Sequence, residues 1–196
     1  MKRLIPAALA LTFAALSGCV APVGPVQVTR FHAADVSPLG KGTIAVEPAP
    51  GSDGNSLEWQ TYSAAVTRQL ILLGYSEARP GSGGQVALVR LSRRTLEAPG
   101  SSPVSVGVGG STGSYGSGVG LGVGINLSPK PAAEVATDLS VSIRDRTSGA
   151  TLWEGRATFV VSSKSQLATT ALGAPKMSQA LFAGFPGQSG ETIEVK

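Results

Sequence analysis

A charge-free, glycine-rich stretch at residues 98–129 constrains the fold of this chain more than any other feature. Ten of the chain's 26 glycines lie between Gly100 and Gly124. Glycine is a poor helix former, so this composition argues against a helical bundle. Aliphatic residues alternate with small or polar ones, which is the two-residue period of a β-strand. The stretch therefore predicts two strands joined through Gly109–Gly118, with one aliphatic face and one bare face.

The aliphatic positions of this predicted hairpin are the candidate interaction residues. Three interpretations stay open: the hairpin packs into its own domain, it docks on a partner or self-associates, or it inserts into a membrane. Docking or self-association is a candidate because unpaired strand edges template pairing with another strand. Insertion would require a closed assembly of several copies, since a lone hairpin leaves its edges unpaired in lipid. The candidate positions are Val104, Val106, Val108, Val119, Leu121, Val123 and Ile125.

The N-terminus has the pattern of a secretory signal peptide. Lys2 and Arg3 precede an apolar stretch from Leu4 to Leu16, and the small residues Ser17 and Gly18 come before Cys19. Small residues followed by cysteine resemble the bacterial lipobox, and this is the chain's only cysteine. We therefore expect residues 1–18 to be removed at the Gly18–Cys19 bond. Cys19 would then carry a diacylglyceryl group and an N-acyl chain such as palmitate, which together give stable membrane anchoring.

The rest of the chain predicts a tether followed by one domain. Val20 after the lipidated cysteine favours the outer membrane over the inner one, with the domain facing the periplasm. The proline-containing residues 19–42 predict a tether, with some extended pairing near Gln27–Phe31. Residues 43–196 are then a single domain that includes the glycine-rich hairpin.

Charge arithmetic weakens any argument for a nucleic-acid partner. The whole chain carries 16 basic and 12 acidic residues, but Lys2 and Arg3 leave with the signal peptide, so the mature chain has 14 and 12. The densest basic cluster is Arg90, Arg93 and Arg94, without interleaved aromatic residues. We interpret it as a solvated strand face and expect no nucleic-acid binding.

Periodicity predicts two helices and several strands. A helix capped by Asn55 or Ser56, with Glu58 in a capping box, ends at Gly74. Its apolar face consists of Trp59, Tyr62, Val66, Leu70 and Leu73. A second helix is expected to begin near Ala174, with Pro175 in its first turn and Met177 and Leu181 on its apolar face. Strands are predicted at residues 43–47, 85–96, 139–144, 152–161 and 192–195, with a hairpin turn at 145–149.

These elements predict an α+β fold. It should have two layers, a mostly antiparallel sheet and two helices packed on one face, plus the glycine-rich β-hairpin.

Catalytic motifs are weak in this sequence, and we expect no enzyme. One cysteine and one histidine argue against a metal centre, and no cofactor is predicted. The G-x-S-x-G match at Gly109–Gly113 lacks the later histidine that a hydrolase needs, because His32 lies upstream. An alternative function is a periplasmic binder of small ligands or glycans, with its cleft near Trp59 and Tyr62.

Three stretches resemble bacterial lipoproteins of the domain-of-unknown-function 4136 family. They are the helix from Ser56 to Tyr75, the strand start Thr151–Gly155 and the ending Ala180–Gly187, within a likeness that covers roughly Phe31 to Val195. The chain departs from the family at Gln85, where members often carry an acidic residue. The resemblance implies a lipid-anchored envelope domain without established catalytic residues. We therefore expect a protein that acts by protein–protein contact or as a structural part of the envelope.

Overall fold

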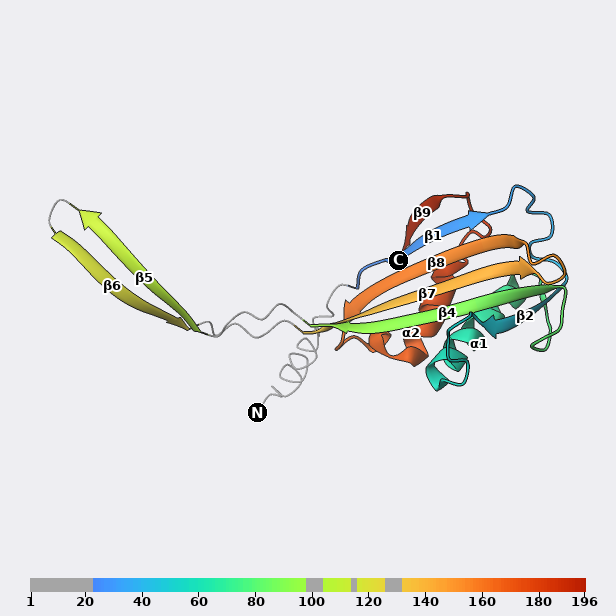
Figure 1. The fold of residues 1–196 in the computed structure, drawn as a ribbon, viewed down its shortest axis with the longest axis horizontal. Helices are drawn as coiled ribbons and strands as arrows, with labels where there is room; N and C mark the ends of the chain where they lie inside the picture. Colours follow the sequence, from blue (N-terminus) through green and yellow to red (C-terminus); the bar gives the residue numbers. More distant parts are fainter. Residues whose placement is uncertain (1–22, 98–103, 114–115, 126–131) are drawn as a thin grey trace, which may run out of the picture.

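The computed structural model describes residues 23–97, 104–113, 116–125 and 132–196. The domain is α+β, as predicted: a seven-stranded, mostly antiparallel sheet with two helices packed together over one face (Figure 1). The strand order is β3-β2-β4-β7-β8-β1-β9, and only the pairs β2–β3 and β2–β4 are parallel. The elements are β1 (Val26–His32), β2 (Thr43–Pro48), α1 (Leu57–Leu72), β3 (Ser76–Glu77), β4 (Gln85–Leu96), β5 (Val104–Gly113), β6 (Gly116–Ile125), β7 (Glu134–Asp145), β8 (Thr151–Ser162), the short 3₁₀ helix η1 (Gln166–Ala168), α2 (Thr170–Leu181) and β9 (Glu191–Val195).

Helix α1 forms where its caps and periodicity predict. Ser56 is the N-cap, and its side-chain oxygen accepts the backbone N–H of Trp59 at 3.4 Å. Tyr62, Val66 and Leu70 are buried on the predicted apolar face. The chain leaves the helix through Gly74, whose φ is +103°. Glycine adopts this left-handed backbone conformation easily, whereas a residue with a side chain would be strained there.

Strands β7 and β8 form the predicted hairpin around Asp145. One carboxylate oxygen of Asp145 accepts the backbone N–H groups of Thr147 at 3.1 Å and Ser148 at 2.7 Å. Hydrogen bonds from the Ser148 backbone and hydroxyl, followed by that from Thr147, lower the pKa of the Asp145 carboxyl below its usual value of 3.8. The turn is therefore held by the ionised side chain.

Replacing Asp145 by asparagine should make the domain less sensitive to acid. A carboxyl whose pKa is lowered by folding contributes its full stability above 3.8, and this contribution is lost as the pH falls through the lower folded pKa. Asparagine keeps an acceptor oxygen but does not titrate. Urea unfolding at about pH 6 and about pH 3 should show a smaller loss of stability for the variant. An equal loss in both proteins would contradict this role of Asp145.

The predicted tether is too long, because the sheet begins well before residue 43. Strand β1 pairs antiparallel with β8 and with β9, and Val26 and Val28 are fully buried. The extended pairing expected near Gln27–Phe31 is thus a full strand in the sheet. Its partners lie more than a hundred residues later in the chain, so the local sequence indicated extended backbone here but not its place in the sheet.

Helix α2 begins four residues earlier than predicted, at Thr170 instead of Ala174. Pro175 consequently lies inside the helix and not in its first turn, so the carbonyl of Ala171 lacks its usual N–H partner. The predicted apolar residues Met177 and Leu181 are fully buried against the sheet. The amphipathic pattern therefore located the buried face correctly but not the helix start.

The aromatic part of the core joins β8 to the segment after α2. The fully buried ring of Trp153 stacks on Phe182 and packs tilted against Phe185. Gly155 provides the room: a Cβ at this position would come within 2.2 Å of the Trp153 ring. This close approach explains a glycine in the middle of a central strand.

Strands β5 and β6 confirm the predicted glycine-rich hairpin. They form a two-stranded sheet of their own and pair with no other strand in the described part of the chain (Figure 1). Gly113 pairs with Gly116, so the strands run further toward the tip than the connection predicted at Gly109–Gly118. The glycines of that predicted connection are therefore all strand residues.

Candidate functional site

The predicted lipidation site is not among the described residues. Cys19, the Gly18–Cys19 cleavage position and the signal peptide of residues 1–18 all lie outside them. Lipidation stays a prediction from the sequence. In the described segments, neither helix is long and apolar enough to cross a membrane.

The hairpin register brings the seven candidate interaction positions together. Val104 pairs with Ile125, Val106 with Val123, and Val108 with Leu121. The seventh position, Val119, pairs with Gly110. Because alternate strand residues lie on opposite faces, all seven positions share one face of the hairpin. The opposite face carries Gly107–Gly122 and Gly109–Gly120 pairs.

The ligand cleft predicted near Trp59 and Tyr62 is filled with side chains. Tyr62 is buried in the core, its hydroxyl directed at the sulfur of Met177 at 3.9 Å, and burial raises the pKa of that hydroxyl. Trp59 packs against the core and donates its indole N–H to the carbonyl of Val89 at 3.2 Å. A hollow of about 340 Å³ beside β4 includes Trp59 but not Tyr62. This arrangement counts against a glycan site between α1 and the sheet.

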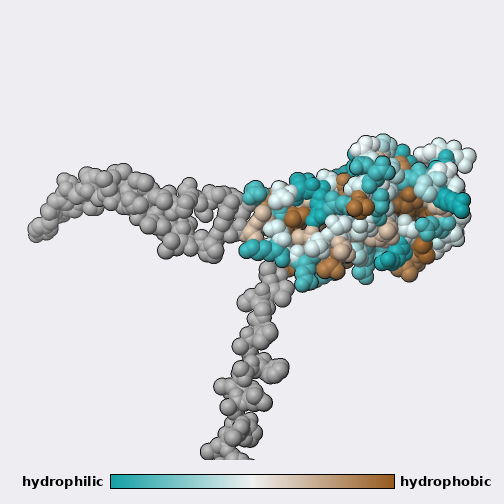
Figure 2. Space-filling model, turned by 90° about the horizontal axis from the view of Figure 1, so that it is seen from below, coloured by the Kyte–Doolittle hydropathy of each residue, from teal (hydrophilic) through white to brown (hydrophobic). Residues whose placement is uncertain are grey.

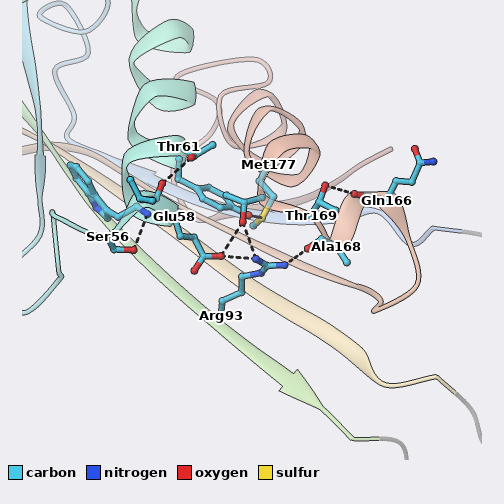
Figure 3. A network of polar contacts seen from close by, with 12 residues as sticks. Ser56, Glu58, Thr61, Arg93, Gln166, Ala168, Thr169 and Met177 are labelled. Atoms are coloured by element: carbon cyan, nitrogen blue, oxygen red, sulfur yellow. Dashed lines mark hydrogen bonds and ion pairs between the residues drawn. The ribbon is translucent and has the colours of Figure 1, made fainter.

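The basic cluster predicted as one solvated face is split between two faces of β4. Arg93 lies on the helix side, where its guanidinium donates to Glu58 at 2.5 Å, to Thr170 at 3.1 Å and to the carbonyl of Ala168 (Figure 3). Glu58 therefore pairs with Arg93 instead of closing the predicted capping box. This network ties β4 to the start of both helices and has a structural role.

Arg90 and Arg94 lie on the other face of β4, as the prediction of a solvated face required. This face of the sheet is not covered by the helices, and we call it the open face (Figure 1). Arg94 pairs with Asp138 of β7 at 3.1 Å. Arg90 lies at a groove of about 400 Å³ that was not predicted from the sequence.

Figure 2 shows the domain from below, turned by 90° from Figure 1. On this side, hydrophilic residues are interspersed with isolated hydrophobic ones.

The groove on the open face arises from a contrast in side-chain length between neighbouring strands. Its floor includes Ser140 and Ser142 of β7. The register places Ser140 between Arg90 of β4 and Arg156 of β8, and Ser142 between Leu88 and Glu154. The longer side chains of β4 and β8 thus stand on either side of the two short serines of β7, which leaves a groove between them. Within the described residues, no three His, Cys, Asp or Glu side chains come close enough to hold a metal ion.

The chain has a distant relative among known proteins. No family model matches the chain, so membership in the 4136 family stays a prediction. The chain is 28% identical to an uncharacterized protein of Zymomonas mobilis, over 88% of this chain and 80% of that protein, which indicates a distant bacterial homologue.

The chain is similar to two solved structures, in both cases with a TM-score under 0.5. A PDZ domain protein from Parabacteroides distasonis matches with a TM-score of 0.49 at 11% identity, over 88% of this chain. The chain spans only 39% of that protein's length. A PelC dodecamer from Paraburkholderia phytofirmans matches with a TM-score of 0.43 at 14% identity, over 80% of this chain and 96% of that one. Likenesses this weak define neither a family nor an activity for this chain.

Proposed function

We propose that this chain is a lipid-anchored protein of the outer membrane that acts by protein–protein contact and not by catalysis. Its domain faces the periplasm, and Cys19 holds it to the membrane. The contact is made by the β5–β6 hairpin with the same hairpin of a second copy. The stretches that resemble the 4136 family of lipoproteins support the envelope location.

The separate pairing of β5 and β6 is the observation that supports this contact. A two-stranded hairpin alone is marginally stable in water. The outer edge of each strand carries backbone N–H and C=O groups that no other described strand pairs with. One face of the hairpin groups seven aliphatic positions, and burying them would be favourable. The hairpin of a second copy has the same strand edge and the same aliphatic face, so its hydrogen-bonding groups and side chains have matching spacing.

A charge on the aliphatic face should disrupt this association. We expect Val106→Lys and Val123→Lys to remove most of the self-association, because a buried lysine without a partner is costly. The matched control is Ser105→Lys, which adds the same charge on the opposite face of the same strand. A photoreactive amino acid at Val108 would report the contact in living cells as a crosslinked dimer on denaturing gels.

The outcomes separate self-association from docking on another protein. Dimer crosslinks that persist in Ser105→Lys and are lost in Val106→Lys support the proposal. Crosslinks only to a different protein would show that the partner is not a second copy. No crosslinked product at native expression would remove the support for the hairpin as a contact surface.

A further inference from the structure

We propose that the groove on the open face of the sheet binds an acidic oligosaccharide whose sugar rings carry carboxylates. This proposal is independent of the hairpin contact, since the described residues that line the groove belong to β1, β4, β7, β8 and the segment after β2. The charge, the shape and the apolar residues of the groove all match such a ligand.

The groove has an excess of positive charge. Arg90, Arg144 and Arg156 line it, against a single acidic residue, Glu154. None of these three arginines forms an ion pair with another described residue, whereas Arg30, Arg93, Arg94 and Arg146 all do. Arg90 only donates to the carbonyl of Pro50 at 3.0 Å, and Arg144 to the hydroxyl of Ser142 at 3.3 Å. Guanidinium groups have five N–H donors in a fork that matches a carboxylate, so donors remain for a ligand.

The arginines are spread along the groove and do not converge on one point. Arg90 and Arg156 lie on strands separated by β7, so their backbones are about 10 Å apart, twice the usual strand spacing. A single small anion would engage one side of such a groove. A chain of sugars with a carboxylate on successive rings would contact both sides. A volume of about 400 Å³ is within the range for small-molecule sites.

The remaining lining also matches a sugar. The hydroxyl of Ser140 and the carboxylate of Glu154 can exchange hydrogen bonds with sugar hydroxyls, whereas the hydroxyl of Thr29 already pairs with that of Thr192 at 2.8 Å. Phe31 is 53% exposed at one side of the groove, and Leu88 and Pro50 also line it. Such apolar surface can pack against the C–H face of a sugar ring. An inorganic anion would make no use of these residues.

Titration calorimetry on the full chain in detergent tests this site with trigalacturonic acid as the probe. Maltotriose serves as the neutral probe and inorganic phosphate as the small anion. The double variant Arg90→Gln and Arg156→Gln should bind trigalacturonic acid at least about tenfold more weakly, because two charge-assisted contacts are lost. Arg68→Gln is the matched control, since Arg68 is exposed on α1, in the helical layer on the opposite side of the sheet from the groove. Glu154→Gln should bind the probe more tightly, because Glu154 is the single acidic side chain among the described residues that line the groove.

Binding of trigalacturonic acid but not maltotriose, weakened by added salt and by the double variant, supports the site. The circular dichroism spectra should be unchanged, because the replaced arginines are exposed. The proposal is overturned if trigalacturonic acid does not bind, or if the double variant binds it as well as Arg68→Gln does. Phosphate or maltotriose binding as tightly as the acidic sugar would overturn the assignment of the ligand.

Discussion

Trp153→Ala should lower the free energy of unfolding by about 3–5 kcal/mol, the usual cost of truncating a large buried aromatic side chain. The Trp153 ring is fully buried, with its centroid 5.3 Å from that of Phe182 and 5.2 Å from that of Phe185. Its indole N–H also donates to the carbonyl of Pro186 at 3.0 Å. Truncation therefore opens a cavity, removes two aromatic contacts and leaves a carbonyl without its donor. Because domains are typically stable by about 5–15 kcal/mol, this loss is a large fraction of the total stability.

Urea unfolding followed by far-ultraviolet circular dichroism measures this loss without depending on tryptophan fluorescence. The matched control is Trp59→Ala, the same substitution at a side chain that is only partly buried. It should cost clearly less, because part of its ring already faces solvent. Trp153→Phe should cost about 1 kcal/mol from the lost hydrogen bond plus a smaller cavity term. A Trp153→Ala loss under about 1 kcal/mol would contradict this description of the core.

Trp153 also contacts the segment between α2 and β9, through Phe182, Phe185 and the carbonyl of Pro186. Arg30 of β1 holds the same segment: its buried guanidinium donates to the carbonyl of Ala183 at 2.5 Å and lies 3.7 Å from the Glu191 carboxylate. The segment leads into β9, the strand at one edge of the sheet. Loosening the aromatic cluster should therefore weaken the pairing of β9 with β1 as well as the core itself.

Elements set by local patterns could be predicted from the sequence. The alternation around residues 139–161 gave the β7–β8 hairpin, because both strands and the turn at Asp145 are neighbours in the chain. The apolar spacing from Trp59 to Leu73 gave α1 and its buried face. The hairpin of β5 and β6 followed from the glycine alternation, although its connection was placed too broadly.

Features that depend on distant residues could not be predicted in the same way. Strand β1 has its partners β8 and β9 at the other end of the chain, and nearby prolines made its surroundings look like a tether. Glu58 has the spacing of a capping-box residue, yet it pairs with Arg93, which is 35 positions away. The start of α2 was missed because proline is commonest in the first turn, and this helix contains it further along.

The groove illustrates the same limit for function. Arg90, Ser140 and Arg156 belong to three strands, and only the register of β4, β7 and β8 brings them into one row. In the sequence, Arg90 seemed to belong with Arg93 and Arg94. Strand alternation could have separated Arg93 from the other two, because odd and even positions lie on opposite faces. The serines of β7 gave no signal, since serine is ordinary on a solvated strand.

Cys19→Ser should abolish acylation and remove the protein from the outer membrane. The thioether to the diacylglyceryl group needs the cysteine sulfur, and each buried methylene of an acyl chain contributes about 0.8 kcal/mol to membrane binding. Labelling cells with an alkyne analogue of palmitate, followed by separation of inner and outer membranes on a sucrose gradient, measures both effects. The variant should carry no label and be absent from the outer-membrane fraction.

Val20→Asp is the matched control for this substitution, because it changes the next residue and leaves the sulfur in place. It should keep the palmitate label but shift the protein to the inner membrane, as expected for aspartate after the lipidated cysteine. The two variants thus separate acylation from sorting. Label that persists in Cys19→Ser would show that another residue is modified, and the lipid anchor would then have to be placed elsewhere. A wild-type chain without label would contradict lipidation at Cys19. The acidic-sugar groove and the hairpin contact do not depend on this result, because each is tested by its own experiment.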